Sequence, residues 1–260
     1  MSEAGESLDI ETVVWEDPSD PAPLAAAAPD VACVAAFGVL LSPEILTVPR
    51  AEFLNVHPSL LPRHRGGAPV PATILAGDEE SGVTIHRTVA ALDAGPVILA
   101  RRTGVGERET SGELLARLGN MGGECLDEAL TLIEDGSADF TEQDEAGATE
   151  CSRLVKQDGR VRWEDSAAQV DRQVRSVTPW PGARTSLRGR GLTIRRGRHL
   201  EHSAIGPAGT AAGCEEGLAV ACGTGSYLVE MLQPDGRREM TVAEWLRGSP
   251  LPDPAVLESS

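Results

Sequence analysis

The segment FLNVHPSLLPRHRGGAP (residues 53–69) constrains the fold of this chain more than any other stretch. An apolar, strand-like run ends with an asparagine and a histidine two positions apart, and a loop rich in proline, arginine and glycine follows. Residues two apart in a strand point to the same face, so we expect Asn55 and His57 to project together. A strand whose only role is to fill a core would not end in this way.

Strand-like and helix-like patterns alternate through the first half of the chain. Residues 31–38 are almost continuously apolar, which is typical of a strand buried on both faces of a parallel sheet. We expect further strands at residues 10–16, 82–89 and 96–103, and helices at residues 42–49, 69–77 and 110–136. This alternation predicts an α/β domain with a mainly parallel sheet.

A second unit is expected after residues 136–150, which are polar and acidic and form a good domain boundary. Residues 166–177 have the apolar spacing of a helix, and short strand-like segments separated by glycine turns follow. This order is typical of a small β-barrel of the oligonucleotide-binding (OB) type. The predicted domains are therefore residues 1–146, with a partial parallel sheet, and residues 151–253, with an OB-like β-barrel.

The formal net charge of −17 argues at first against a nucleic-acid partner. The charge is uneven, however: residues 1–150 hold 8 arginines and 27 acidic residues, whereas residues 151–200 hold 12 basic and 4 acidic residues. The basic block is either a solvated face beside acidic neighbours or a surface for a phosphate-bearing partner. The count alone leaves both interpretations open.

The remaining composition argues against several protein classes. The five cysteines are widely spaced without a CxxC pair, so we expect reduced, buried thiols and no disulfide scaffold. No metal site is expected, because the histidines other than His57 lack ligand spacing and are predicted to face solvent or lie in loops; they are His64, His86, His199 and His202.

The same sequence predicts a cytoplasmic protein. No basic residue precedes Arg50, as a standard signal or transit peptide would require, and the longest apolar run (residues 31–41) is too short to span a bilayer.

The pair formed by Asn55 and His57 allows two interpretations. The side chains could simply end the strand and bond to the loop. Alternatively, they lie at the carboxyl edge of the sheet, where α/β proteins place their ligand sites, and offer an amide donor and an imidazolium donor to an oxyanion. Asp93, in a loop expected at the same edge, would orient the imidazole and favour its charged form. Without a serine or cysteine nucleophile nearby, this set indicates acyl transfer in which the substrate supplies the attacking group.

Three motifs together resemble the folate-dependent formyltransferases: NVHPSLLPRHRGGAP (55–69), AGDEESGVTIHR (76–87) and ALDAGPV (91–97). The resemblance implies that Asn55, His57 and Asp93 are catalytic, that the formyl donor is 10-formyltetrahydrofolate, and that no metal takes part. It also implies that a folate-contacting loop is formed by Ser59, Leu60, Leu61 and Pro62.

The second half of the chain indicates which group of formyltransferases the sequence resembles. Residues 154–189 are similar to the linker and the start of the C-terminal domain of methionyl-tRNA formyltransferases, in which an OB-like barrel helps to hold the tRNA. The implied acceptor is initiator methionyl-tRNA, and we expect a monomer that needs no membrane. The formyltransferases that act on 4-amino-sugar nucleotides also share the loop and a Pro-Trp-Pro segment, so this alternative stays open.

One departure from the family pattern concerns the beginning of the sequence. The strand–helix–strand unit that opens the family domain, with its Gly-Thr-Pro-type turn, has no counterpart here, and we expect an exposed apolar edge along residues 31–38. Either the start lies too far downstream, or the chain is a truncated, inactive binding module. Trp180, between two prolines, is expected to be a packing anchor between the domains rather than a stacking platform for a base.

Overall fold

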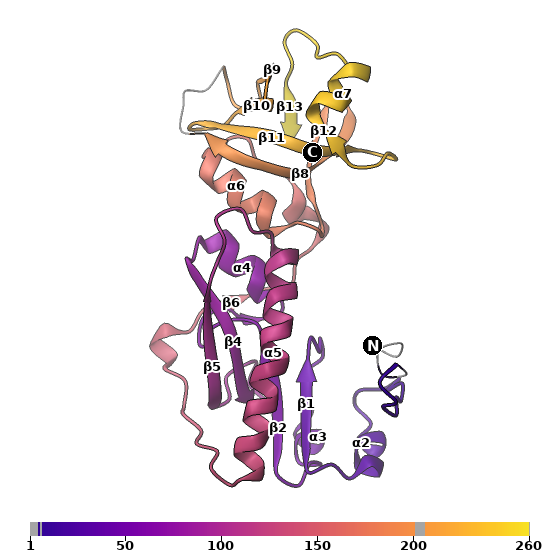
Figure 1. Ribbon diagram of the computed structural model, residues 1–260, viewed down its shortest axis with the longest axis vertical. Coiled ribbons are helices and arrows are strands. Elements are labelled where there is room, and N and C mark those ends of the chain that lie inside the picture. The colour runs from indigo at the N-terminus through magenta and orange to yellow at the C-terminus, as the bar shows by residue number, and fades with distance from the viewer. Residues whose placement is uncertain (1–4, 6, 201–205, 260) are drawn as a thin grey trace.

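The first sheet has four strands in the order β1–β2–β4–β5 (Figure 1). The computed structural model describes residues 5, 7–200 and 206–259. The strands are β1 (Val31–Ala35), β2 (Glu52–His57), β4 (Glu80–Arg87) and β5 (Val97–Gly104). β1 and β2 are parallel, but β2–β4 and β4–β5 are antiparallel. The α/β prediction is confirmed, whereas the expectation of mainly parallel pairing was wrong, because the short 88–96 connection makes β4 and β5 neighbours of opposite direction.

Helices pack against this sheet and close its core. The longest, α5 (Ser111–Glu134), begins with the predicted capping box between Thr110 and Glu113. Its apolar stripe packs on the sheet in a cluster that includes Leu54, Ile85 and Leu118. The shorter helices of this half are α2 (Ala22–Ala27), α3 (Pro43–Leu46) and α4 (Pro69–Ala76).

Strand β1 is an edge strand of the described sheet, and Ala32 is its only buried residue. The prediction that it is buried on both faces was wrong, because no strand of the described residues pairs with its outer side. The exposed apolar edge expected from the resemblance is confirmed: Phe37, just after the strand, is 39% exposed. The strand expected at residues 10–16 was also wrong; this segment has no regular structure, and Trp15 stacks on Phe37.

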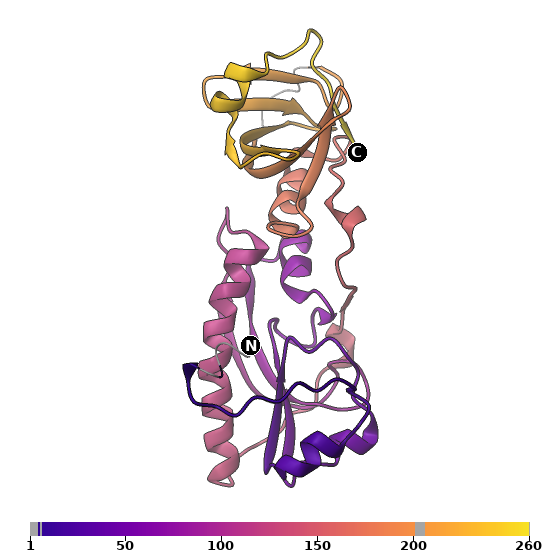
Figure 2. The same cartoon turned by 90° about the vertical axis from the view of Figure 1, so that its right-hand side faces the viewer.

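The second half forms a curled antiparallel sheet in the order β13–β7–β8–β11–β10–β9 (Figure 2). It confirms the predicted barrel-like domain, with β12 pairing with β11 off the main path. Its core surrounds Trp163 and Tyr227 and is closed by helices α6 (Ala167–Ser176) and α7 (Val242–Gly248). The strands are β7 (Ala183–Leu187), β8 (Arg190–Leu200), β9 (Ala211–Cys214), β10 (Gly217–Ala221), β11 (Ser226–Pro234), β12 (Met240–Thr241) and β13 (Leu257–Ser259).

The two halves lie end to end and touch through helices (Figure 1). α4 packs against α6, and the backbone N–H of Gly112 and the hydroxyl of Ser111 both donate to the carbonyl of Thr178. An extended connection after α5 runs back along the first half before it enters the barrel (Figure 2). It contains the 3₁₀ turns Glu145–Gly147 and Lys156–Gly159 and the short strand β6 (Glu150–Cys151), which pairs with β3 (Arg65–Gly66).

Two further predictions about side chains were wrong in part. Trp180 is 55% exposed, so it is not a packing anchor; Trp163 fills the barrel core instead. All five cysteines are free, but only Cys125 and Cys222 are buried, while Cys33 and Cys214 are exposed on edge strands.

Candidate active site

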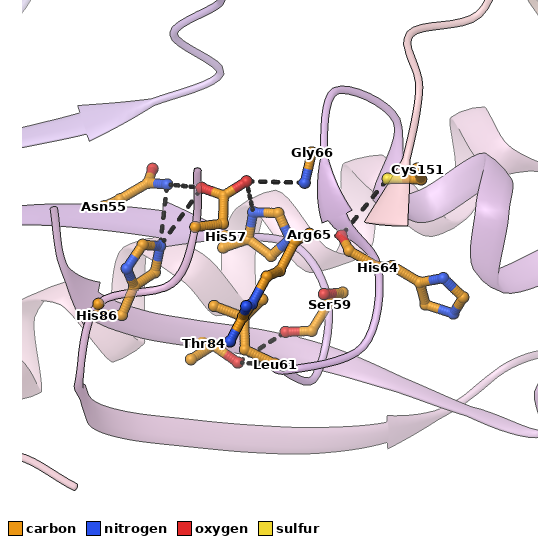
Figure 3. Close-up of polar contacts among 12 residues, drawn as sticks. Asn55, His57, Ser59, Leu61, His64, Arg65, Gly66, Thr84, His86 and Cys151 are labelled. Carbon is orange, nitrogen blue, oxygen red and sulfur yellow. Dashed lines mark hydrogen bonds and ion pairs between the residues drawn. The ribbon is translucent and has the colours of Figure 1, made fainter. Parts of the chain in front are cut away.

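Strand β2 brings Asn55 and His57 to one face of the sheet, as the alternation predicts (Figure 3). The register aligns Asn55 with His86 and His57 with Thr84 on the neighbouring strand β4. The imidazole of His57 is buried, being only 3% exposed, and Asn55 is half-buried. The two side chains therefore lie against the interior rather than in open solvent.

Asp93 converges on this pair from the turn between β4 and β5. Its Oδ1 accepts a hydrogen bond from Nδ2 of Asn55 at 3.0 Å, and its Oδ2 lies 3.6 Å from Nδ1 of His57. The backbone N–H of Gly66 donates to the same Oδ2 at 2.8 Å. Burial alone would raise the pKa of Asp93, but the interactions with His86, His57 and the Gly66 amide outweigh it and lower that pKa. The carboxylate is therefore ionised at neutral pH.

The protonation of His57 differs from the sequence-based expectation. Burial lowers the pKa of His57 below its ordinary value, and the nearby Asp93 carboxylate only partly opposes this effect. At neutral pH the imidazole is therefore neutral, not the imidazolium that was expected. Its Nε2 lies 3.0 Å from the carbonyl oxygen of His64, which can only accept, so Nε2 carries the proton. Nδ1 is then the nitrogen that can take up a proton, and it faces Asp93.

His86 belongs to the same cluster, although the sequence interpretation placed it in solvent or a loop. It is 1% exposed, and its Nδ1 donates to the carbonyl of Arg87 at 2.9 Å. Its Nε2 lies 3.1 Å from Nδ2 of Asn55 and 3.6 Å from Oδ1 of Asp93. The amide nitrogen of Asn55 thus lies within hydrogen-bond distance of both Asp93 and His86. Local sequence carries no signal for this placement, because the pairing of β4 with β2 sets His86 opposite Asn55.

The other histidines follow different patterns. His64 lies in a loop, one of the two predicted placements, but it is buried there, and its Nε2 pairs with Oδ2 of Asp78 at 2.7 Å. His199 is exposed, as predicted, and His202 lies outside the described residues. Within the part of the chain that the structure describes, no group of three or more His, Cys, Asp or Glu side chains is arranged to hold a metal ion.

The loop of residues 59–62 is held firmly beside the cluster. The carbonyl of Ser59 accepts from the hydroxyl of Thr84 at 2.7 Å, and this hydroxyl accepts from the N–H of Leu61 at 3.1 Å. Ser59 is buried and its hydroxyl donates to the carbonyl of Arg63, so its side chain is not free for a ligand. Leu60, Leu61 and Pro62 instead line an open hollow of about 690 Å³, together with charged residues such as Asp78. Asn55, His57 and Asp93 do not line this hollow.

The arrangement provides a proton acceptor, a carboxylate that stabilises the protonated acceptor, and an amide donor beside them. The nearby Cys151 is half-buried, and burial raises the pKa of its thiol, so it is a poor nucleophile. The geometry therefore suits a reaction in which the substrate supplies the nucleophile.

Comparison with known proteins shows which protein family the chain belongs to. A profile described as "Formyl transferase" matches residues 17–130, and one described as "Formyl transferase, C-terminal domain" matches residues 153–250. A methionyl-tRNA formyltransferase of Cereibacter sphaeroides is 39% identical over 236 residues, covering 91% of this chain and 76% of that protein. The chain belongs to the methionyl-tRNA formyltransferase family. Its relative in Gluconobacter oxydans is 40% identical and covers 97% of this chain and 83% of that protein.

Solved structures of other proteins share the fold of this family member. The N-formyltransferase of Helicobacter canadensis, in complex with folinic acid and dTDP-3-aminofucose, superposes with a TM-score of 0.68 at 15% identity, covering 92% of this chain and 82% of that chain. HypX of Aquifex aeolicus, in complex with tetrahydrofolic acid, gives a TM-score of 0.66 at 21% identity, covering 88% of this chain and 41% of that chain. Within the described residues, no helix has the length and hydropathy needed to cross a membrane.

Proposed function

We propose that this protein transfers a formyl group from 10-formyltetrahydrofolate to the amino group of methionyl-initiator tRNA, for translation initiation. The observation that carries the proposal is the similarity to methionyl-tRNA formyltransferases, at about 40% identity along both halves of the chain. The solved formyltransferases with this fold hold tetrahydrofolic acid or folinic acid, which supports a folate donor. We further propose that residues 1–146 catalyse the transfer and that residues 151–253 hold the tRNA.

In the proposed reaction, the neutral methionyl amine attacks the formyl carbon of the donor. A C–N bond forms, and the formyl oxygen becomes an oxyanion, to which the amide of Asn55 would donate a hydrogen bond now directed elsewhere. Nδ1 of His57 takes the amine proton, and the ionised Asp93 stabilises the resulting imidazolium. When the intermediate collapses, the bond to N10 of tetrahydrofolate breaks, and His57 returns its proton to that nitrogen.

The folate-contacting role of Ser59, Leu60, Leu61 and Pro62 is also proposed. The two leucines and the proline offer apolar surface to a ligand, whereas Ser59 would act only through its backbone, because its hydroxyl is buried and bonded.

The basic residues of the barrel half support a tRNA partner. Five of the twelve basic residues at positions 151–200 form ion pairs, for example Arg198 with Glu216 and Arg175 with Asp171. Six others are exposed and form no ion pair within the described residues. One of these six, Arg153, donates to the carbonyl of Gly38, and we call the other five the free basic set: Lys156, Arg160, Arg188, Arg190 and Arg196. Unpaired cations at the surface can release counterions when they meet phosphates.

The deciding experiment offers the full gene product charged initiator tRNA and a 4-amino-sugar nucleotide in parallel, each with 10-formyltetrahydrofolate. We expect transfer to the tRNA, with a rate at subsaturating tRNA that falls steeply as salt is added. Transfer to the sugar alone would overturn the acceptor while keeping the chemistry. Failure with both, given a folded protein, would favour an inactive binding module. We also propose that the protein is cytoplasmic and that it is a monomer. Sedimentation in the presence and absence of tRNA tests the monomeric state.

A further inference from the structure

The connection between the two halves makes close contact with the loop that follows His57. Residues 143–151, which we call the strap, run beside residues 62–67 and exchange backbone hydrogen bonds with them. The N–H of Arg65 donates to the carbonyl of Thr149 at 2.8 Å, and the N–H of Thr149 donates to the carbonyl of Pro62 at 3.2 Å. This loop also supplies the Gly66 N–H that donates to Asp93, so the strap holds a segment that contacts the catalytic residues.

One side chain of the strap reaches the backbone of the Asp93 turn. Nε2 of Gln143 donates to the carbonyl of Asp93 at 2.8 Å and to the carbonyl of Gly95 at 2.7 Å. Its Oε1 accepts from Nε and Nη2 of Arg65, at 3.0 and 2.8 Å. Carbonyls only accept and a guanidinium only donates, so the amide of Gln143 fits in one orientation alone.

The guanidinium that orients Gln143 is itself fixed. Arg65 is 7% exposed, although arginine is rarely buried without a partner. Its remaining N–H groups donate to the two carboxylate oxygens of Glu145, at 2.7 and 3.1 Å. Glu145, Arg65 and Gln143 therefore form a continuous chain of hydrogen bonds from the solvent-exposed strap to the Asp93 turn.

The backbone of the Asp93 turn is in a sparsely populated conformation, and contacts from outside the turn help to hold it. Asp93 has a φ of +48°, a left-handed value that aspartate adopts more often than most residues but less often than the right-handed one. Gly95 is pressed against β4: a Cβ there would lie 1.8 Å from the carbonyl of Arg87. Just beyond the turn, Val97 and Thr141 exchange two backbone hydrogen bonds, which brings Gln143 into reach.

We propose that Gln143 is a positioning residue for formyl transfer: its amide holds the 93–95 turn so that the Asp93 carboxylate stays directed at Asn55 and His57. The reactive part of this inference rests on the proposed function. Gln143 does not touch the reacting atoms, and its effect passes through the Asp93 backbone. A small displacement of this turn would move the carboxylate away from Nδ1 of His57, and misplacement by about 1 Å can cost on the order of 10²-fold in rate.

The test uses two substitutions and one matched control. Gln143→Glu keeps the size of the side chain and its acceptor for Arg65 but cannot donate to the two carbonyls, and Gln143→Leu removes all four bonds. The control is Gln233→Leu in the barrel. There, Oε1 of Gln233 also accepts from Nε and Nη2 of an arginine, Arg195, and its Nε2 donates to a backbone carbonyl, that of Arg237.

Two readouts separate positioning from stability. The first is kcat at saturating donor and acceptor, which we expect to fall by about 10²-fold in both Gln143 variants with little change in the tRNA KM. The second is the imidazole pKa of His57, followed by ¹⁵N NMR of the five histidines. The titratable groups that face His57 are Asp93, His86 and His64. Since Asp93 raises this pKa, displacement of its carboxylate should lower the pKa of His57 further.

The outcomes are distinct. If Gln233→Leu lowers stability as much as Gln143→Leu but keeps kcat and the His57 pKa, the positioning role stands. If both Gln143 variants keep the wild-type kcat and the wild-type His57 pKa, or if the control loses as much, the role is overturned. If the wild type transfers no formyl group, the proposed function fails, while the His57 titration still reports whether Gln143 places Asp93.

Discussion

Nδ1 of His57 lies 3.6 Å from Oδ2 of Asp93, although the two residues are 36 positions apart and come from the end of β2 and the β4–β5 turn. The distance is longer than a normal hydrogen bond between two heavy atoms. Because Nε2 already donates to His64, Nδ1 is unprotonated in the neutral ring and faces a carboxylate. This pairing becomes favourable once Nδ1 gains a proton, so the geometry is prepared for the imidazolium formed during reaction.

Replacing His57 by alanine should remove most of the activity. We expect kcat/KM for formyl transfer to fall by about 10²–10⁴-fold, because the proton acceptor is lost. The fold should persist, since the ring contacts the loop through a single hydrogen bond to His64. Formyl transfer to charged tRNA and far-UV circular dichroism measure the two effects, and His199→Ala, at an exposed histidine, is the control. Activity within a few-fold of wild type would remove His57 from the mechanism.

Replacing Asp93 by asparagine should shift the acidic limb of the pH–rate profile. His57 must be neutral to accept the amine proton, so the rate rises with pH through the pKa of His57, which lies below its ordinary value of 6.5. Asp93 raises that pKa by stabilising the imidazolium, and removing the charge lowers it further. The acidic limb of kcat/KM should therefore move to lower pH while the plateau falls. A shift to higher pH would contradict the assigned charge interaction.

The central part of the site could be predicted from local sequence. The spacing of Asn55 and His57 fixes their common face, because strand geometry alone determines it. The prediction that Asp93 joins them required its loop to lie at the same edge of the sheet. A short connection between two neighbouring strands keeps the loop at that edge. His86 was missed because a buried histidine and an exposed one look alike in an alternating strand.

The supporting contacts could not be predicted in this way. Gln143 lies in an acidic, polar stretch without periodicity, and it meets Asp93 across 50 residues of sequence. Likewise, β9 and β13 are short, and each forms a strand by pairing with one neighbour, β10 and β7 respectively, rather than through its own composition. The expected strand at residues 10–16 failed for the opposite reason: its sequence suits a strand, but no sheet partner is available in the described structure.

The two tryptophans near the barrel should differ sharply in their effect on stability. Trp180 is 55% exposed, so Trp180→Ala should change the free energy of unfolding by less than about 0.5 kcal/mol. Trp163 is 1% exposed and its indole N–H donates to Thr185, so Trp163→Ala should cost about 3–5 kcal/mol. Urea unfolding of both variants measures the difference. A loss of several kcal/mol at Trp180 would restore its role as a packing anchor.

The free basic set should account for the salt dependence of tRNA binding. We expect Arg196→Gln and Arg160→Gln each to weaken binding of initiator tRNA and to reduce the slope of log K against log salt by about 1, because each variant releases one fewer counterion. Arg50→Gln is the control: Arg50 is exposed but paired with Asp30, and it lies just before β2 in the first half of the chain, outside the barrel. Filter binding over a range of salt concentrations gives the slopes. If the Arg50 variant lowered the slope as much as the other two, tRNA would not be held by the barrel face in particular.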